Sequence, residues 1–312
     1  MQAQKSVALK AGSNLGVIAP ASPAHPEKVA AGLKELQRLG YRVSYAPEQQ
    51  SAADGYFSAT ADKRLAEFLE LAAADNVNGI IASRGGYGSN YLLEGLSKAS
   101  LPVPKCVIGF SDVTTLQIYL WQSYKWVSIH GPMLAAGLEG GPNVPGGYDE
   151  ASFLNAIRRT GGGWRIPLHG DTIRSGHAEG ILLGGCMTLI EATIGTPWEL
   201  ETRGAILVLE DRAMKPYQVD RVLMHFKQAG KFNGVAGILL GEFPECEAPV
   251  KGSPTVRDVC NRILGPLGIP IVFGAPVGHT PRPMLTLPLG VRARVDATGE
   301  GLLEILEPAV SE

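Results

Sequence analysis

The fold is predicted by one stretch of sequence, GIIASRGGYGSNYLLEGL, which covers residues 79–96. Its first four residues indicate a buried strand, residues 83–89 form a glycine-rich turn, and the leucines near its end indicate a short helix. A second apolar run at 106–110 follows as the next strand. This order of elements is typical of βαβ units, so we expect a mostly parallel sheet covered on both faces by helices.

The same alternation extends outward from this stretch. In the first part of the chain, strands are expected at residues 16–19 and 42–46, and helices at 26–40, around 65–72 and at 113–120. Glycine and proline clusters interrupt the pattern between about 137 and 176, where only a short helix near 151–159 is expected. Beyond them the sequence predicts strands at 180–183, 205–210, 235–240, 271–274, 291–295 and 302–305, with helices near 218–229 and 255–264. We therefore predict an α/β domain at residues 1–137, a linker at 138–175 and a strand-rich α+β or barrel-like domain at 176–312.

Composition excludes several classes of function. The 312 residues carry 28 Lys and Arg against 30 Asp and Glu, so no basic field exists to attract nucleic acid. No apolar run approaches the ~20 residues of a membrane span, and the start lacks the apolar core of a signal peptide. The four cysteines form no C-x-x-C pair, and no H-E-x-x-H motif occurs. We expect a cytoplasmic protein without a metal or an organic cofactor.

Ser111 is the first candidate for chemistry. It follows the strand at 106–110 and precedes a helical run, which is the strand–turn–helix setting of a nucleophile elbow. Only the first glycine of G-x-S-x-G is present, because Val113 occupies the last position. A structural alternative is that Ser111 caps the helix, and the pattern alone favours that alternative about twofold.

The glycine turn that contains Arg84 and Gly86 also lies where a strand ends and a helix begins. Its N–H groups could bind phosphate, or they could form an oxyanion hole together with the N–H of the residue after the nucleophile. The dinucleotide fingerprint fails because Tyr91 stands where the third glycine belongs, and no P-loop motif occurs. A tight turn without any ligand stays an equal alternative.

A serine nucleophile needs a base and an acid that orients the base. His130 and His279 each follow an apolar run and stand beside a glycine, at the exits of predicted strands. Glu210 ends another strand and could hold an imidazole, although an ion pair with Arg212 is the commoner fate of such an acid. Spacing alone does not choose among these partners.

Seven motifs, in this order, resemble the L,D-carboxypeptidase family of serine peptidases, which includes muropeptide carboxypeptidases and microcin C immunity peptidases. They are VIAPAS (17–22), RGGYG (84–88), GFSD (109–112), HGP (130–132), GG (184–185), LED (209–211) and GH (278–279). The resemblance implies a catalytic triad of Ser111, Glu210 and His279, with the N–H groups of Gly86 and Asp112 as the oxyanion hole. It also implies a Rossmann-like N-terminal domain, a smaller β-rich C-terminal domain, an active site between them and a homodimer.

Two positions depart from the family pattern. Cys186 replaces an asparagine after the paired glycines, and Tyr91 stands where an arginine is common. A thiol hydrogen-bonds only weakly, so substrate contacts at Cys186 are expected to differ, whereas Arg84 is a candidate partner for substrate carboxylates. We expect release of the terminal D-alanine from cytoplasmic murein tetrapeptides during peptidoglycan recycling. The alternatives are a microcin-type peptidase that cleaves an aminoacyl-nucleotide, and a phosphate-binding protein without enzymatic activity.

Overall fold

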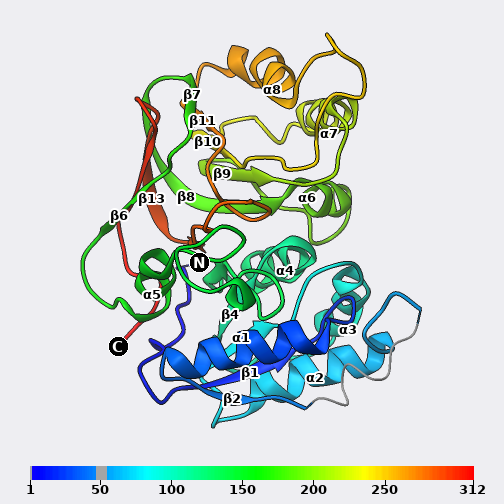
Figure 1. Ribbon diagram of the computed structural model, residues 1–312, viewed down its shortest axis with the longest axis vertical. Coiled ribbons are helices and arrows are strands. Elements are labelled where there is room, and N and C mark those ends of the chain that lie inside the picture. The colour runs from blue at the N-terminus through cyan, green and yellow to red at the C-terminus, as the bar shows by residue number, and fades with distance from the viewer. Residues whose placement is uncertain (1, 47–54) are drawn as a thin grey trace.

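The first sheet of the molecule is mostly parallel. The computed structural model describes residues 2–46 and 55–312 and contains two sheets (Figure 1). The first has the order β12-β5-β4-β3-β1-β2, in which β12 alone is antiparallel to its neighbour. Its strands are β1 (Asn14–Ile18), β2 (Arg42–Ser44), β3 (Gly79–Ala82), β4 (Cys106–Gly109), β5 (Ser128–His130) and β12 (Leu287–Leu289).

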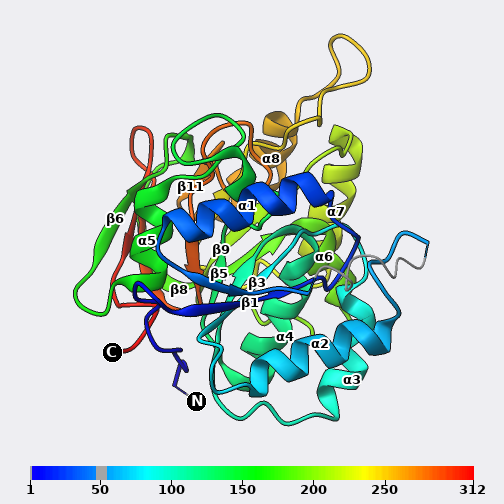
Figure 2. The same cartoon turned by 60° about the horizontal axis from the view of Figure 1, so that its bottom comes forward.

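Helices cover both faces of this sheet. They are α1 (Pro26–Arg38), α2 (Ala61–Ala73), α3 (Leu93–Ser97) and α4 (Thr114–Tyr124), with α5 (Glu150–Arg158) farther along the chain. Figure 2 shows α1 on one side of the strands and α2, α3 and α4 on the other. Every residue of β1, β3 and β4 is buried, as expected for parallel strands between two helical layers.

The second sheet has the order β6-β14-β13-β8-β9-β10-β11-β7. Its strands are β6 (Trp164–Pro167), β7 (Asp171–Arg174), β8 (His177–Cys186), β9 (Ala205–Glu210), β10 (Gly237–Leu240), β11 (Ile271–Phe273), β13 (Arg292–Asp296) and β14 (Leu302–Ile305). The strands from β8 to β11 are parallel, and the remaining pairs are antiparallel. Three helices pack with this sheet, namely α6 (Met187–Thr193), α7 (Pro216–Gln228) and α8 (Val256–Leu264). The predicted α/β fold, with a parallel sheet followed by a strand-rich second part, is confirmed.

Two features differ from the sequence prediction. The segment 138–175, expected to be a linker with one short helix near 151–159, contains that helix as α5 and also the two edge strands β6 and β7, which were not expected. These strands are four residues long and lie between glycine and proline turns, so their periodicity is too short to detect. In addition, β12 belongs to the C-terminal part of the sequence but pairs with β5 of the first sheet, not with the second sheet. The domain boundaries at 137 and 176 stay a prediction.

The apolar interior connects the two parts of the chain. One cluster of buried side chains runs from Ile18 and Ile108 of the first sheet to Val208 and Val295 of the second. A second cluster lies among α6, α7, α8 and the second sheet. Within residues 2–46 and 55–312, no helix has the length and apolar character that crossing a membrane requires.

Candidate active site

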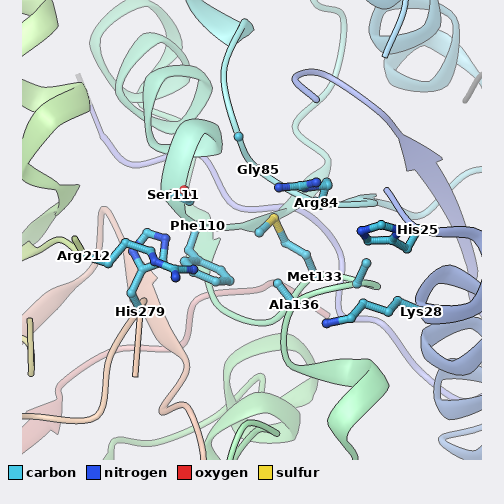
Figure 3. Close-up of a pocket in the computed structure, with 12 residues that line it drawn as sticks. His25, Lys28, Arg84, Gly85, Phe110, Ser111, Met133, Ala136, Arg212 and His279 are labelled. Atoms are coloured by element: carbon cyan, nitrogen blue, oxygen red, sulfur yellow. The ribbon is translucent and has the colours of Figure 1, made fainter. Parts of the chain in front are cut away.

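A cleft lies where strands of both sheets end. Ser111 follows β4, the glycine turn follows β3, and the loop after β11 carries His279. These segments surround a cavity of about 270 Å³, the Ser111 cavity, which Figure 3 shows. Its lining residues are His25, Lys28, Arg84, Gly85, Gly86, Phe110, Ser111, Met133, Ala135, Ala136, Arg212 and His279. An adjoining cavity of about 320 Å³ shares Phe110, Arg212 and His279 with it, so the two form one cleft.

The backbone at Ser111 is strained. Its φ angle is +60°, in the left-handed region that side chains other than glycine rarely adopt. A short 3₁₀ turn (Ser111–Val113) leads from this residue into α4. The N-cap positions of the turn and of α4 are Phe110 and Val113, so the helix-cap alternative for Ser111 does not hold. The geometry is that of a nucleophile elbow, in which the hydroxyl is presented at the top of the sheet.

Glycines let the backbone approach Ser111 closely. A Cβ atom on Gly85 would lie 2.9 Å from the Ser111 Cβ and 3.4 Å from the backbone nitrogen of Asp112. Gly86 has a φ of +113°, and a Cβ atom there would lie 2.3 Å from the Ser22 Oγ. Only glycine fits at both positions, and the peptide groups of the glycine turn therefore lie next to the serine.

Glu210 and His279 form a buried pair. Glu210 Oε2 lies 2.7 Å from His279 Nδ1 and accepts the backbone N–H of His279 at 2.9 Å. The Glu210 side chain is fully buried, whereas 14% of the His279 side chain is exposed. A carboxylate that fixes Nδ1 leaves Nε2 to face a substrate, as in a catalytic triad. Arg212 instead pairs with Glu245, so the alternative ion pair with Glu210 is not formed.

Burial and charge oppose each other in this pair. Burial raises the pKa of the Glu210 carboxyl, but the nearby His279 and its hydrogen bonds outweigh burial and hold this pKa below its usual value. Burial lowers the pKa of the His279 imidazole, but the charge of Glu210 and its hydrogen bond outweigh burial and raise this pKa. The pair thus favours the charged form of both groups, a carboxylate beside an imidazolium.

His130 is not placed to act as the base. It ends β5, is fully buried and is absent from the linings of both cavities of the cleft. Burial lowers the pKa of its imidazole, and neither ring nitrogen has a hydrogen-bonding partner in the described part of the chain. Its ring packs edge to face against Phe110 at 6.1 Å, and Phe110 packs against His279 at 5.1 Å. Of the two histidines left open by the sequence, His279 is the one that is hydrogen-bonded to the acid and lines the cleft.

The side chain of Asp112 occupies the start of the helix after the glycine turn. Its Oδ2 accepts the backbone N–H of Ser89 at 2.8 Å, and the carboxylate is fully buried. A phosphate bound at this helix start would meet that carboxylate, and the two negative charges would repel each other. The geometry therefore disfavours the phosphate alternative for the glycine turn.

The two predicted substrate contacts have different surroundings. Arg84 lines the Ser111 cavity, and its Nη1 donates to the backbone oxygen of Pro23 at 3.0 Å. Cys186 is 3% exposed and lines neither cavity of the cleft, and its N–H donates to Thr114 Oγ1 at 3.2 Å. The thiol itself lies at the start of α6, beside the N–H groups of Thr188 and Leu189, and burial raises its pKa. A substrate contact at Cys186 stays a prediction that the linings of the two cavities do not support. Tyr91, the other departure, is 53% exposed beside Tyr87.

Several cleft residues were not predicted from the sequence. His25, Lys28 and Arg212 line the Ser111 cavity, and Lys28 pairs with Glu139 at 3.1 Å. No sequence motif marks these three residues. A lone basic residue at a helix start or a strand end has many possible roles, so the sequence could not assign them to the cleft. In the described residues, no group of three or more His, Cys, Asp or Glu side chains is arranged to hold a metal ion.

An α/β fold that gathers a strained serine, a histidine and a buried glutamate at one cleft has the arrangement of a hydrolase. Comparison with known proteins agrees: the chain belongs to the LD-carboxypeptidase family, a family of peptidases. The family model for the N-terminal domain matches residues 15–131, and the model for the C-terminal domain matches residues 179–295. The resemblance stated from the sequence is thereby confirmed.

Murein peptide carboxypeptidases and a microcin C7 self-immunity protein are similar to this chain along nearly its whole length. A probable murein peptide carboxypeptidase of Bacillus subtilis is 33% identical over 312 residues, which are 99% of this chain and 96% of the relative. The solved structure of the microcin C7 self-immunity protein MccF in its apo state has a TM-score of 0.87, with 26% identity over 98% of this chain and 99% of MccF. The structure of a muramoyltetrapeptide carboxypeptidase from Oxalobacter formigenes has a TM-score of 0.80, with 26% identity over 95% and 99% of the two chains.

Proposed function

We propose that this chain is a serine-type L,D-carboxypeptidase that releases the terminal D-alanine of murein tetrapeptides in the cytoplasm, as a step of peptidoglycan recycling. The observation that carries the proposal is the meeting, in one cavity, of the strained Ser111 and of His279, whose Nδ1 is held by the buried Glu210. The names of the Bacillus and Oxalobacter relatives support the substrate class.

In the proposed mechanism, His279 accepts the hydroxyl proton of Ser111 while the serine oxygen attacks the carbonyl carbon before the terminal D-alanine. The N–H groups of Gly86 and Asp112 bind the resulting oxyanion. The C–N bond then breaks, and the leaving amine of D-alanine takes the proton from His279. His279 then takes a proton from water while the water oxygen attacks the acyl carbon; the ester C–O bond breaks, and His279 returns the proton to the Ser111 oxygen.

Arg84 supplies the recognition of a carboxypeptidase substrate in this proposal. A carboxypeptidase must bind the free terminal carboxylate, and a guanidinium matches a carboxylate with two parallel hydrogen bonds. Arg84 lines the same cavity as Ser111, and one of its five N–H donors is bonded to the backbone oxygen of Pro23. A guanidinium in the cavity lining is therefore suited to a substrate carboxylate.

The high structural similarity to MccF makes cleavage of an aminoacyl-nucleotide the second candidate. Solved structures of MccF include complexes with aspartyl sulfamoyl adenosine and glutamyl sulfamoyl guanosine. A nucleobase needs an aromatic face on which to stack. Trp164 is buried in β6, and Trp198 lines a separate cavity, so neither indole lies in the lining of the cleft. The Phe110 ring does line it, but Phe110 is 4% exposed and its ring packs against His130 and His279. This arrangement favours the peptide over the nucleotide.

The experiment compares the two substrates directly. The protein is incubated with a murein tetrapeptide or with aspartyl sulfamoyl adenosine, and products are followed by mass spectrometry. We expect loss of one alanine from the tetrapeptide with the higher kcat/KM, and no reaction with a tetrapeptide that ends in L-alanine. Faster turnover of the adenosine compound would overturn the substrate assignment. The homodimer, which also stays a proposal, is tested by light scattering on the eluting protein.

A further inference from the structure

One peptide group of the glycine turn is held at both of its polar ends. The carbonyl oxygen of Gly88 accepts a hydrogen bond from Arg64 Nη1 at 2.8 Å. The N–H of the same peptide group, which belongs to Ser89, donates to Asp112 Oδ2 at 2.8 Å. Arg64 comes from α2, whereas Asp112 directly follows Ser111. The Gly88–Ser89 peptide thus lies between a buried cation and a buried carboxylate.

Arg64 is buried to an unusual degree for an arginine, with 2% of the residue exposed. Its Nε donates to the backbone oxygen of Ala59 at 3.0 Å, and its Nη1 also donates to the backbone oxygen of Pro20. Its guanidinium lies over the Phe57 ring at 4.8 Å from the centroid. Burying a charge is costly unless it is paired and hydrogen-bonded, and here three carbonyl groups and the charge of Asp112 supply that compensation. Arg64 is thereby hydrogen-bonded to three segments: the one after β1, the one before α2 and the glycine turn.

The geometry at Gly88 shows how closely the turn fits this arginine. Gly88 has a φ of +135°, and a Cβ atom there would lie 2.7 Å from Arg64 Nη1. The other end of the turn is held by Ser22, whose N–H donates to the Gly85 oxygen at 3.3 Å and whose Oγ accepts the N–H of Tyr87 at 3.2 Å. Gly86, the proposed oxyanion donor, lies between these two anchors.

We propose that Arg64 is a positioning residue for the oxyanion hole: through the Gly88–Ser89 peptide and Asp112, it sets the distance between the N–H of Gly86 and the turn that carries Ser111. This inference rests on the proposed serine mechanism. Oxyanion donors act only when they are held in place before the reaction, and a misplacement of ~1 Å can cost about 100-fold in rate.

The test uses a fluorophosphonate, which reacts with an activated serine whatever the natural substrate is. The variant Arg64→Met keeps an unbranched side chain that fills the space of the arginine stem but removes its donors and its charge. We expect its labelling rate constant to fall about 100-fold while the final labelling still reaches one probe per chain. A loss of folded protein would instead lower the final stoichiometry. An unchanged rate constant at full stoichiometry would overturn the proposal.

Arg158 offers a matched control. It donates to the backbone oxygen of Leu39 at 2.7 Å and lies over the Tyr41 ring at 5.0 Å, so it makes the same kinds of contact as Arg64. Leu39 and Tyr41 lie just before β2, an edge strand that β1 and β3 separate from β4, and they are at its amino end, whereas Ser111 lies at the carboxyl end of β4. Arg158→Met should lower the unfolding temperature while its labelling rate constant stays within about twofold of that of the parent protein.

A double variant tests whether Arg64 acts through the shared peptide. Asp112→Asn keeps the shape of the side chain and removes its charge. Because both residues hold the Gly88–Ser89 peptide, Arg64→Met combined with Asp112→Asn should slow labelling by clearly less than the product of the two single effects. Multiplicative effects would show that the two residues act independently and would contradict the proposal. If the unchanged protein is not labelled at all, the serine mechanism itself fails, and this result is distinct from any outcome for Arg64.

Discussion

Glu210 Oε2 lies 2.7 Å from His279 Nδ1 and also accepts the backbone N–H of the same histidine. One buried oxygen therefore fixes both the ring and the main chain of His279. The loop after β11 is held against the end of β9, and the imidazole is turned toward the cavity that Ser111 lines. This relationship underlies the predictions for the acid and the base.

Ser111→Ala should abolish hydrolysis of the murein tetrapeptide, with kcat reduced by about 10⁶-fold, because the hydroxyl is the attacking group. The protein should keep its fold, since Ser and Ala differ little in size. Release of alanine is measured by mass spectrometry, and circular dichroism checks the fold. Turnover comparable with that of the unchanged protein would end the triad hypothesis.

His279→Ala should lose about as much activity as Ser111→Ala, because the members of a triad act as a unit. His130→Ala should retain more activity, since His130 lies outside the lining of the cleft and contacts neither Ser111 nor Glu210 through a hydrogen bond in the described chain. Both variants are compared by kcat/KM at equal amounts of folded protein. The opposite ranking would show that the wrong histidine has been assigned as the base.

Glu210→Gln should lower kcat by roughly 10⁴-fold, by analogy with serine proteases whose acid becomes an amide. The pH profile adds a second readout. The base must be neutral to accept a proton, so kcat/KM falls as the pH drops through the pKa of His279. Burial lowers this pKa and the Glu210 charge raises it above the usual value, so loss of the charge should move the acidic limb of the profile to lower pH. A limb that stays in place would contradict the role of Glu210.

Gly85→Ala should reduce kcat about 100-fold, because the new Cβ atom would lie 2.9 Å from the Ser111 Cβ and push the serine away from its position. Gly161→Ala is the control, since a Cβ atom there has no neighbour within 4 Å. The two variants are compared by kcat and by thermal unfolding. Equal activity of both would mean that the close approach at Gly85 has no catalytic consequence.

Arg84→Met should remove discrimination between a tetrapeptide with a free terminal carboxylate and the same peptide with a terminal amide. The unchanged protein should prefer the free acid, because a guanidinium pairs with a carboxylate but not with an amide. Arg212→Met is the matched control, because Arg212 lines the same cavity but already pairs with Glu245. The ratio of kcat/KM for the two peptides is measured for each variant, and a preference that survives in Arg84→Met would assign the carboxylate to another residue.

Much of the fold could be predicted because its signals are local. Strands β3, β4 and β9 are runs of apolar residues, and their ends lie within one residue of the predicted ends. The glycine turn and Ser111 were recognised as candidates because the residue types that a tight turn or a nucleophile elbow needs stand next to each other in the chain. By contrast, β6, β7 and β12 were missed, since three or four residues between turns carry too little periodicity.

The sequence by itself thus determined the alternation of strands and helices, the positions of the turns and a short set of candidate side chains. Only the tertiary structure decided that Glu210 pairs with His279 rather than with Arg212, that Cys186 is buried outside the cleft lining, and that Arg64 is buried against the glycine turn. The physical reason is that periodicity and turn chemistry act over a few residues. The pairing of Glu210 with a partner 69 residues away depends on the order in which β9, β10 and β11 assemble in the second sheet, and no local pattern records it.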